Sequence, residues 1–383
     1  MCDILKHTTM KTGDKTMKKI HRTLSLFTVA AMCTALLCSC GKVPDSSQTD
    51  SSSKAATTTT ADTTADTTTT GEASSTASAT SAPDSSVSDS SSAVTDDTKT
   101  NGITPAMWKV TSPEGNTMVM LGSFHALKDE CYPLPEAVTN AYNNADILAV
   151  ECDITSTSED GEYMKNLMKQ MLYNDNTKLS QHISEEAYSA LQTYLGYWGM
   201  DISALEVYRP WAISSTLDTL LIQDADFDSE KGLDNYLLTT AHADGKEIYE
   251  VESVDFQMNL LINFSDDIYD LMFRSYEGET KESQKQALED LYTAWKSGDI
   301  ETFLEEDNEE ELAGYTEEDK KIAEDYNNQM LYDRNKNMAK AAEDLMSQGK
   351  NVFYVVGAAH YAGEGGIIDL LEKDGYTAER VQY

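Results

Sequence analysis

The stretches Met118-Val-Met-Leu-Gly-Ser-Phe-His125 and Phe353-Tyr-Val-Val-Gly-Ala-Ala-His360 decide how this chain folds. Each begins with a short run of apolar residues and then passes through a glycine to a histidine. Continuous apolar runs of this length are typical of strands that lie inside a sheet and are covered on both faces. The two stretches therefore predict two buried strands that each end in the pattern Gly-x-x-His.

Two further apolar runs, Ile147–Val150 and Ile248–Val251, have the same character and predict two more strands of the same sheet. Between the strands, apolar residues recur at helical spacing, and residues 160–345 are mostly helical in pattern. We therefore expect an α/β fold with a central mixed, partly parallel sheet flanked by helices and with a largely helical insertion. The individual expectations are helices at 135–144, at 338–346 with a stop at Gly349 and after Gly365-Gly366, and a terminal strand at Val381.

A polar residue follows each of the four predicted strands. His125 and His360 follow the first and last strands, and Glu151 and Glu252 follow the two between them. The carboxyl ends of parallel strands meet at one edge of a sheet, where ligands bind in open α/β folds. The sequence therefore predicts one polar site assembled from four distant positions.

The chemistry of that site follows from its residue types. Two imidazoles and a carboxylate, here His125, His360 and Glu151, are the ligand set of many hydrolytic metal sites. Glu151 would serve as a ligand or as the general base, and without a metal the same groups form a His/Glu acid–base system on water. Gly122 and Gly357 would let the backbone turn beside the site without crowding by a Cβ atom.

A structural interpretation of the carboxylates remains open. A carboxylate directly against a buried strand needs a partner, because an unpaired buried charge is costly. Arg209 or Arg334 would supply that partner for Glu151 in a plain ion pair. Glu252 has the same ambiguity and ranks lower as a functional residue.

Composition limits the partners and the redox chemistry. The 66 Asp and Glu residues outnumber the 29 Lys and Arg residues, so we expect no binding of nucleic acid. Only Cys131 and Cys152 lie outside the N-terminal leader, and two free buried thiols are favoured over a disulfide. Nothing in the sequence predicts an oligomeric state.

The N-terminal 100 residues predict an exported, anchored protein. Residues 1–40 have the layout of a signal peptide, with Met17 as the expected start. They end in a sequence that resembles a bacterial lipobox, which implies a lipid-modified, palmitate-bearing Cys40. Residues 41–102 form a Ser/Thr/Asp-rich stalk that is expected to be disordered. The domain at 103–383 would then be held at the extracytoplasmic face of the cell membrane by its lipid anchor.

Three blocks in order resemble the TraB/GumN family, and together they cover essentially all of 105–383. The resemblance implies a fold shared with erythromycin-esterase and ChaN-like proteins. The blocks are Trp108 to Asp153 with Gly122-Ser-Phe-His125 inside it, Lys231-Gly-Leu-Asp234 to Gln257, and Asp333-Arg334-Asn335 to Tyr376 with Gly357-Ala-Ala-His360 inside it.

The resemblance extends to the Tiki proteases, which act on secreted peptides and proteins and depend on a divalent metal. It implies a metal such as Mn, Co or Zn, and a peptide or protein substrate. The resemblance assigns the catalytic roles to His125 and His360 of the two Gly-x-x-His motifs, to Glu151 and to Arg334. Asn335 has a supporting role. Arg334 would neutralise a carboxylate or hold a substrate oxyanion. The alternative function is a non-catalytic protein that sequesters a pheromone-like peptide or haem.

Overall fold

The computed structural model describes residues 102–156, 161–304 and 315–383, and everything below concerns these residues. The predicted signal peptide, Cys40 and the predicted stalk lie outside the described residues. Residues 157–160 and 305–314 do so as well.

A six-stranded sheet with the strand order β4-β3-β5-β2-β1-β6 forms the centre of the described domain. The strands β4, β3, β5 and β2 run parallel to one another, while β1 pairs antiparallel with β2 and with β6. The predicted α/β class and mixed sheet are therefore confirmed. The strands are β1 Met107–Thr111, β2 Thr117–Ser123, β3 Ile147–Val150, β4 Glu247–Glu250, β5 Val352–Gly357 and β6 Thr377–Arg380.

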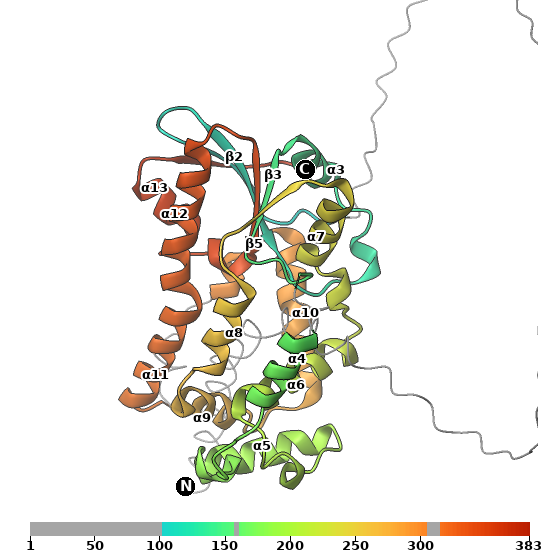
Figure 1. The fold of residues 1–383 in the computed structure, drawn as a ribbon, viewed down its shortest axis with the longest axis vertical. Coiled ribbons are helices and arrows are strands. Elements are labelled where there is room, and N and C mark those ends of the chain that lie inside the picture. Colours follow the sequence, from blue (N-terminus) through green and yellow to red (C-terminus); the bar gives the residue numbers. More distant parts are fainter. Residues whose placement is uncertain (1–101, 157–160, 305–314) are drawn as a thin grey trace, which may run out of the picture. The chain divides into compact units, whose positions relative to one another are not determined.

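Helices cover both faces of the sheet and extend beyond one end of it. In Figure 1, α12 and α13 lie on one side of the sheet and α3 and α7 on the other, while α4, α5, α6 and α9 gather below it. The helices are α3 Glu136–Asn144, α4 Gly161–Gln170, α5 Glu185–Tyr197, α6 Pro210–Asp224, α7 Leu233–Asp244, α8 Val254–Ile262, α9 Asp266–Arg274, α10 Lys281–Ser297, α11 Glu317–Asn327, α12 Asp333–Ser347 and α13 Ile367–Lys373.

Three of the four predicted internal strands lie where the sequence put them. The strands β3 and β5 are buried at every residue, and β2 is buried over most of its length, because helices pack on both faces of the sheet. The predicted strand at 248–251 begins and ends one residue earlier, as β4, and it is an edge strand with mostly exposed residues rather than an internal one. Its Glu247 and Glu250 are the kind of charged residues that an edge tolerates.

The other boundary predictions differ by small amounts. The helix α3 follows Pro135, and α12 ends two residues before Gly349, which has a positive φ of 70°. Val381 lies just past β6, although its N–H still donates to the carbonyl of Met107 at 2.8 Å. The strand β1 was not predicted, because its alternating exposure leaves no continuous apolar run.

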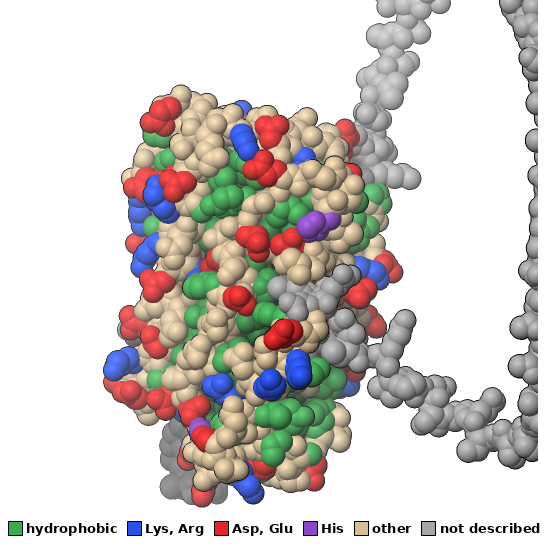
Figure 2. Space-filling view, in the orientation of Figure 1, with side chains coloured by type: hydrophobic (Ala, Val, Ile, Leu, Met, Phe, Trp, Pro, Cys, Tyr) green, Lys and Arg blue, Asp and Glu red, His purple; other side chains and the backbone are tan. Residues whose placement is uncertain are grey.

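Cys131 and Cys152 are buried and free, which confirms the favoured prediction. In the part of the chain that the structure describes, no helix has the length and apolar character needed to cross a membrane. Figure 2 shows acidic side chains spread over one face of the domain, intermingled with lysines, arginines and hydrophobic patches.

Candidate functional site

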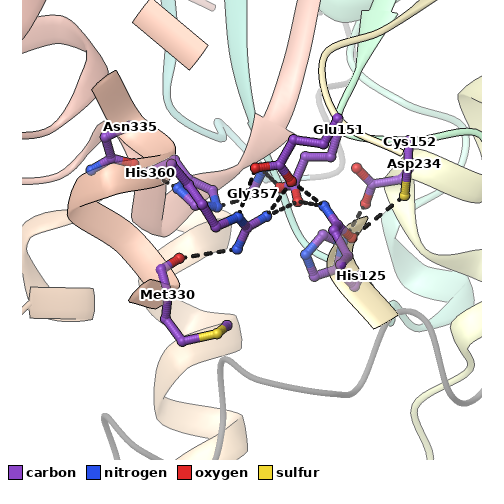
Figure 3. Close-up of polar contacts among 11 residues, drawn as sticks. His125, Glu151, Cys152, Asp234, Met330, Asn335, Gly357 and His360 are labelled. Atoms are coloured by element: carbon purple, nitrogen blue, oxygen red, sulfur yellow. Dashed lines mark hydrogen bonds and ion pairs between the residues drawn. The ribbon is translucent and has the colours of Figure 1, made fainter. Parts of the chain in front are cut away.

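The carboxyl ends of the four parallel strands bring the predicted polar residues together. His125 lies two residues beyond β2, Glu151 directly follows β3, Glu252 lies two residues beyond β4, and His360 lies three residues beyond β5. Figure 3 shows His125, Glu151 and His360 grouped around Gly357. Pairing of β3 and β2 with the central strand β5 produces this convergence.

His125 is held from α7. Its Nδ1 lies 2.7 Å from Oδ2 of Asp234 in the first turn of that helix. The helix approaches closely because Gly232 has no side chain, since a Cβ there would lie 2.1 Å from the carbonyl oxygen of His125. Burial alone would lower the pKa of His125, but the pair with Asp234 outweighs it and raises the pKa to about 9.

His360 is held from α12 in a different way. The Nδ2 of Asn335 donates to the carbonyl of Gly365 at 2.9 Å, so its Oδ1 faces His360 and accepts from Nδ1–H at 2.6 Å. Burial and the nearby Arg334 lower the pKa of His360 to about 3. The imidazole is therefore neutral at pH 7, with its proton on Nδ1 and a lone pair on Nε2.

Glu151 lies between the two histidines. Its Oε1 accepts from the N–H of Gly357 at 2.7 Å and is 3.7 Å from Nε2 of His360. Its Oε2 accepts from Arg334 and from Gln257 at 2.8 Å each. Burial alone would raise the pKa of Glu151, but the guanidinium of Arg334 and the neighbouring imidazoles hold it well below its ordinary value. Glu151 is therefore an ionised carboxylate in a buried setting.

Arg334 binds both predicted carboxylates. Its Nη2 lies 2.8 Å from Oε2 of Glu151, while Nε and Nη2 bind the two oxygens of Glu252 at 2.9 Å each. Of the two arginines considered as partners, Arg334 makes this pair. Arg209 instead donates to the carbonyl of Ile262.

The helix that carries Arg334 has an unusual start. A π-helical turn at Asn328–Tyr332 precedes α12, and Nη1 of Arg334 donates to the carbonyl of Met330 inside that turn at 3.0 Å. Such turns occur frequently at functional sites. The π turn and the arginine side chain therefore support each other.

Gly357 keeps space open at the centre of the group. A Cβ at this position would lie 3.1 Å from Oε1 of Glu151, 3.4 Å from Nε2 of His125 and 3.6 Å from Cδ2 of His360. Its φ of −52° is ordinary, so the position requires glycine for space and not for the sharp turn that the sequence suggested. Gly122 lies farther back, where its carbonyl accepts from the indole N–H of Trp295.

The residues fit a divalent metal by donor type. His125 and His360 each use Nδ1 for a hydrogen bond to a neighbouring oxygen, which leaves Nε2 for a ligand. Metal-binding histidines are held in just this manner. Within the described ranges, no group of three or more His, Cys, Asp and Glu side chains is arranged so that it would hold an ion as it stands.

Two residues of the site were not assigned from the sequence. Asp234 and Gln257 are buried side chains that hold His125 and Glu151. A signal was present, because each polar residue falls on the apolar face of its helix. The other two described histidines, His182 and His242, pair with Asp266 and with Asp153 and lie outside this group.

The chain is similar to proteins described as metalloproteases and to a protein without an assigned activity. The metalloprotease TIKI homolog of Nematostella vectensis is 24% identical over 65% of this chain and 61% of that protein. Metalloprotease TIKI1 of Xenopus tropicalis is 26% identical over 38% of this chain and 32% of that protein. The uncharacterized protein YbaP of Escherichia coli (strain K12) is 26% identical over 41% of this chain and 56% of that protein.

The chain thus spans less than two thirds of the length of these relatives. No solved structure matches it, so the kinship with erythromycin-esterase and ChaN-like folds stays a prediction. Comparison with protein families matches residues 106–380, most of the chain, to one family. The chain belongs to the TraB/PrgY/gumN family.

Proposed function

We propose that this protein is a metal-dependent hydrolase that cleaves peptides. The observation that carries the proposal is the position of Gly357: Oε1 of Glu151, Nε2 of His125 and Cδ2 of the His360 imidazole lie 3.1, 3.4 and 3.6 Å from where a Cβ of residue 357 would be. The similarity to proteins named metalloproteases supports the same reaction class. Roles for individual residues follow from their hydrogen bonds.

His125 and His360 would hold the cation, which we propose to be Mn²⁺, Co²⁺ or Zn²⁺, with Glu151 as a further ligand or as the general base. A bound divalent ion would supply Lewis-acid chemistry, which in such sites lowers the pKa of water from 15.7 to about 7. His360 presents a lone pair on Nε2, because Asn335 fixes its proton on Nδ1. Glu151 stays ionised and presents Oε1, which would serve either as a third ligand or as the acceptor for the proton that water loses.

The side chains differ in their access to solvent, and this difference indicates where substrate would approach. The side chain of His125 is 30% exposed, whereas that of His360 is 5% exposed and that of Glu151 is 11% exposed. We infer that a peptide reaches the site from the side of His125. We further propose that the lipid anchor implied at Cys40 presents the domain to peptides outside the cell membrane.

Metal removal tests the proposed function directly. The purified domain, residues 103–383, should contain about one equivalent of a divalent metal by elemental analysis. A chelator should abolish cleavage of a peptide library, and Mn²⁺ or Co²⁺ should restore it. Equal cleavage by the metal-free protein would contradict the proposal. Stoichiometric peptide binding without product over long incubation would favour sequestration instead.

The affinity for metal should depend on pH through His125. A cation binds the neutral imidazole, whereas the pair with Asp234 raises the pKa of His125 in the free protein to about 9. Metal binding therefore displaces a proton below that pH, and the affinity for Mn²⁺ should rise about tenfold per pH unit from pH 6 to pH 8. Titration calorimetry measures this slope. Asp234→Asn should flatten it, and a flat slope in the unaltered protein would contradict the assignment.

A further inference from the structure

The side chain of Arg334 is committed to contacts within the protein. It donates to both oxygens of Glu252, to Oε2 of Glu151 and to the carbonyl of Met330 at distances between 2.8 and 3.0 Å. A guanidinium has five N–H donors, and these contacts use four of them. The side chain is only 8% exposed. This geometry suits an internal counter-ion better than a group that grips substrate.

Both oxygens of Glu252 are also occupied by contacts within the protein. Arg334 binds its two oxygens, and Nε2 of Gln257 donates to Oε2 at 2.6 Å. The same amide nitrogen donates to Glu151, while Oε1 of Gln257 accepts from the thiol of Cys152 at 3.4 Å. The thiol contact fixes which end of the amide faces the carboxylates. Arg334, Glu252 and Gln257 therefore form a clamp on one side of Glu151.

The clamp makes the two oxygens of Glu151 unequal. Oε2 accepts from Arg334 and from Gln257. Oε1 accepts from the N–H of Gly357 and faces Nε2 of His360. A carboxylate oxygen has two lone pairs, so Oε1 retains one directed into the site.

The charges explain why a second carboxylate is present. One guanidinium facing Glu151 alone would cancel its charge and make it a poor base and a poor ligand. Sharing of Arg334 with Glu252 leaves one unit of negative charge on the group, next to the two histidines. The pair thus orients Glu151 without neutralising it.

We propose that Arg334, Glu252 and Gln257 are positioning residues that hold Oε2 of Glu151, so that Glu151 acts through Oε1 alone. Arg334 then has no part in binding substrate, in contrast to the oxyanion role that the sequence left open. This inference rests on the proposed function for the role of Glu151 in the site, but the contacts of the clamp can be tested without that function.

A double-mutant cycle tests the clamp with Mn²⁺ alone as the probe. Glu252→Gln and Arg334→Lys should each weaken Mn²⁺ binding by about 10–100-fold in titration calorimetry. The double variant should be no weaker than the worse single variant, because both act through Glu151. Arg274→Lys is the matched control, since Arg274 also binds two carboxylates, Asp270 and Asp319, outside the site. It should bind Mn²⁺ like the unaltered protein.

Peptide kinetics separate positioning from substrate binding. Arg334→Lys should lower kcat and leave KM unchanged. A raised KM with unchanged kcat and Mn²⁺ affinity would show that Arg334 binds substrate, and the proposal would fail. Additive effects in the cycle would overturn it as well. If Arg334→Lys does not fold, Gln257→Met removes only one donor to Oε2, and it should lower kcat about tenfold without a change in KM.

The outcomes distinguish this inference from the proposed function. Coupled losses of Mn²⁺ affinity in a protein that cleaves no peptide would refute the hydrolase and support the clamp. If the unaltered protein binds no Mn²⁺, the metal-dependent function fails. In that case the same variants are compared by their free energy of unfolding in urea. Non-additive losses for Glu252→Gln and Arg334→Lys would support the clamp, and additive losses would overturn it.

Discussion

His125→Ala and His360→Ala are each expected to lower the rate of peptide cleavage by about 10²–10⁴-fold. This range is typical for loss of an acid–base group, and loss of a metal ligand would do at least as much. Both imidazoles lie beside Gly357, and the other described histidines, His182 and His242, pair with residues elsewhere. Cleavage of a peptide library, followed by mass spectrometry, measures the loss.

His182→Ala is the matched control for these two variants. His182 also binds an aspartate through Nδ1, at 2.7 Å from Oδ2 of Asp266, but it belongs to no part of the site. Its replacement should leave cleavage unchanged. Full activity in His125→Ala or His360→Ala, with the circular dichroism spectrum preserved, would remove the basis for the proposed site.

Much of the site could be predicted because its residues directly follow the apolar runs. Glu151 directly follows β3, and His125 and His360 lie two and three residues beyond their strands. Parallel pairing then brings strand ends to one edge whatever the intervening sequence does. The pattern of a polar residue directly after an apolar run was therefore enough to group residues that are distant in the sequence, without knowledge of the strand order.

The parts that could not be predicted depend on the helices between the strands. Asp234 reaches His125 because Gly232 lets the start of α7 lie against the backbone of His125, in the loop that follows β2. No periodicity in the sequence specifies this contact between α7 and the loop. The choice of Arg334 over Arg209 as partner of Glu151 likewise depends on how the helices pack, since Arg334 of α12 reaches Glu151 and Arg209 before α6 reaches the carbonyl of Ile262. The edge position of β4 depends on the strand order, which its own residues do not determine.

Arg334→Ala is expected to lower the free energy of unfolding by about 3–5 kcal/mol at pH 7. This is the usual cost of removing one partner from a buried ion pair, because the remaining charge is left without compensation. Here two carboxylates lose their counter-ion, and the side chains of Glu151 and Glu252 are only 11% and 6% exposed. Urea unfolding at fixed ionic strength measures the change.

The pH dependence of this loss separates a buried ion pair from simple loss of packing. Arg334 and the imidazoles depress the pKa of Glu151 in the folded protein below the ordinary 4.5. That stabilisation is present above pH 4.5 and disappears as the pH falls through the folded pKa. The difference between the two proteins should therefore be largest near pH 7 and shrink in acid, where the carboxylates of the variant become protonated.

The control is Arg274→Ala, which removes an arginine side chain that is 30% exposed and should cost about 1 kcal/mol or less. A loss at Arg334 that is equally small, or that does not change with pH, would mean that the arginine contributes packing and that the two glutamates do not depend on its charge.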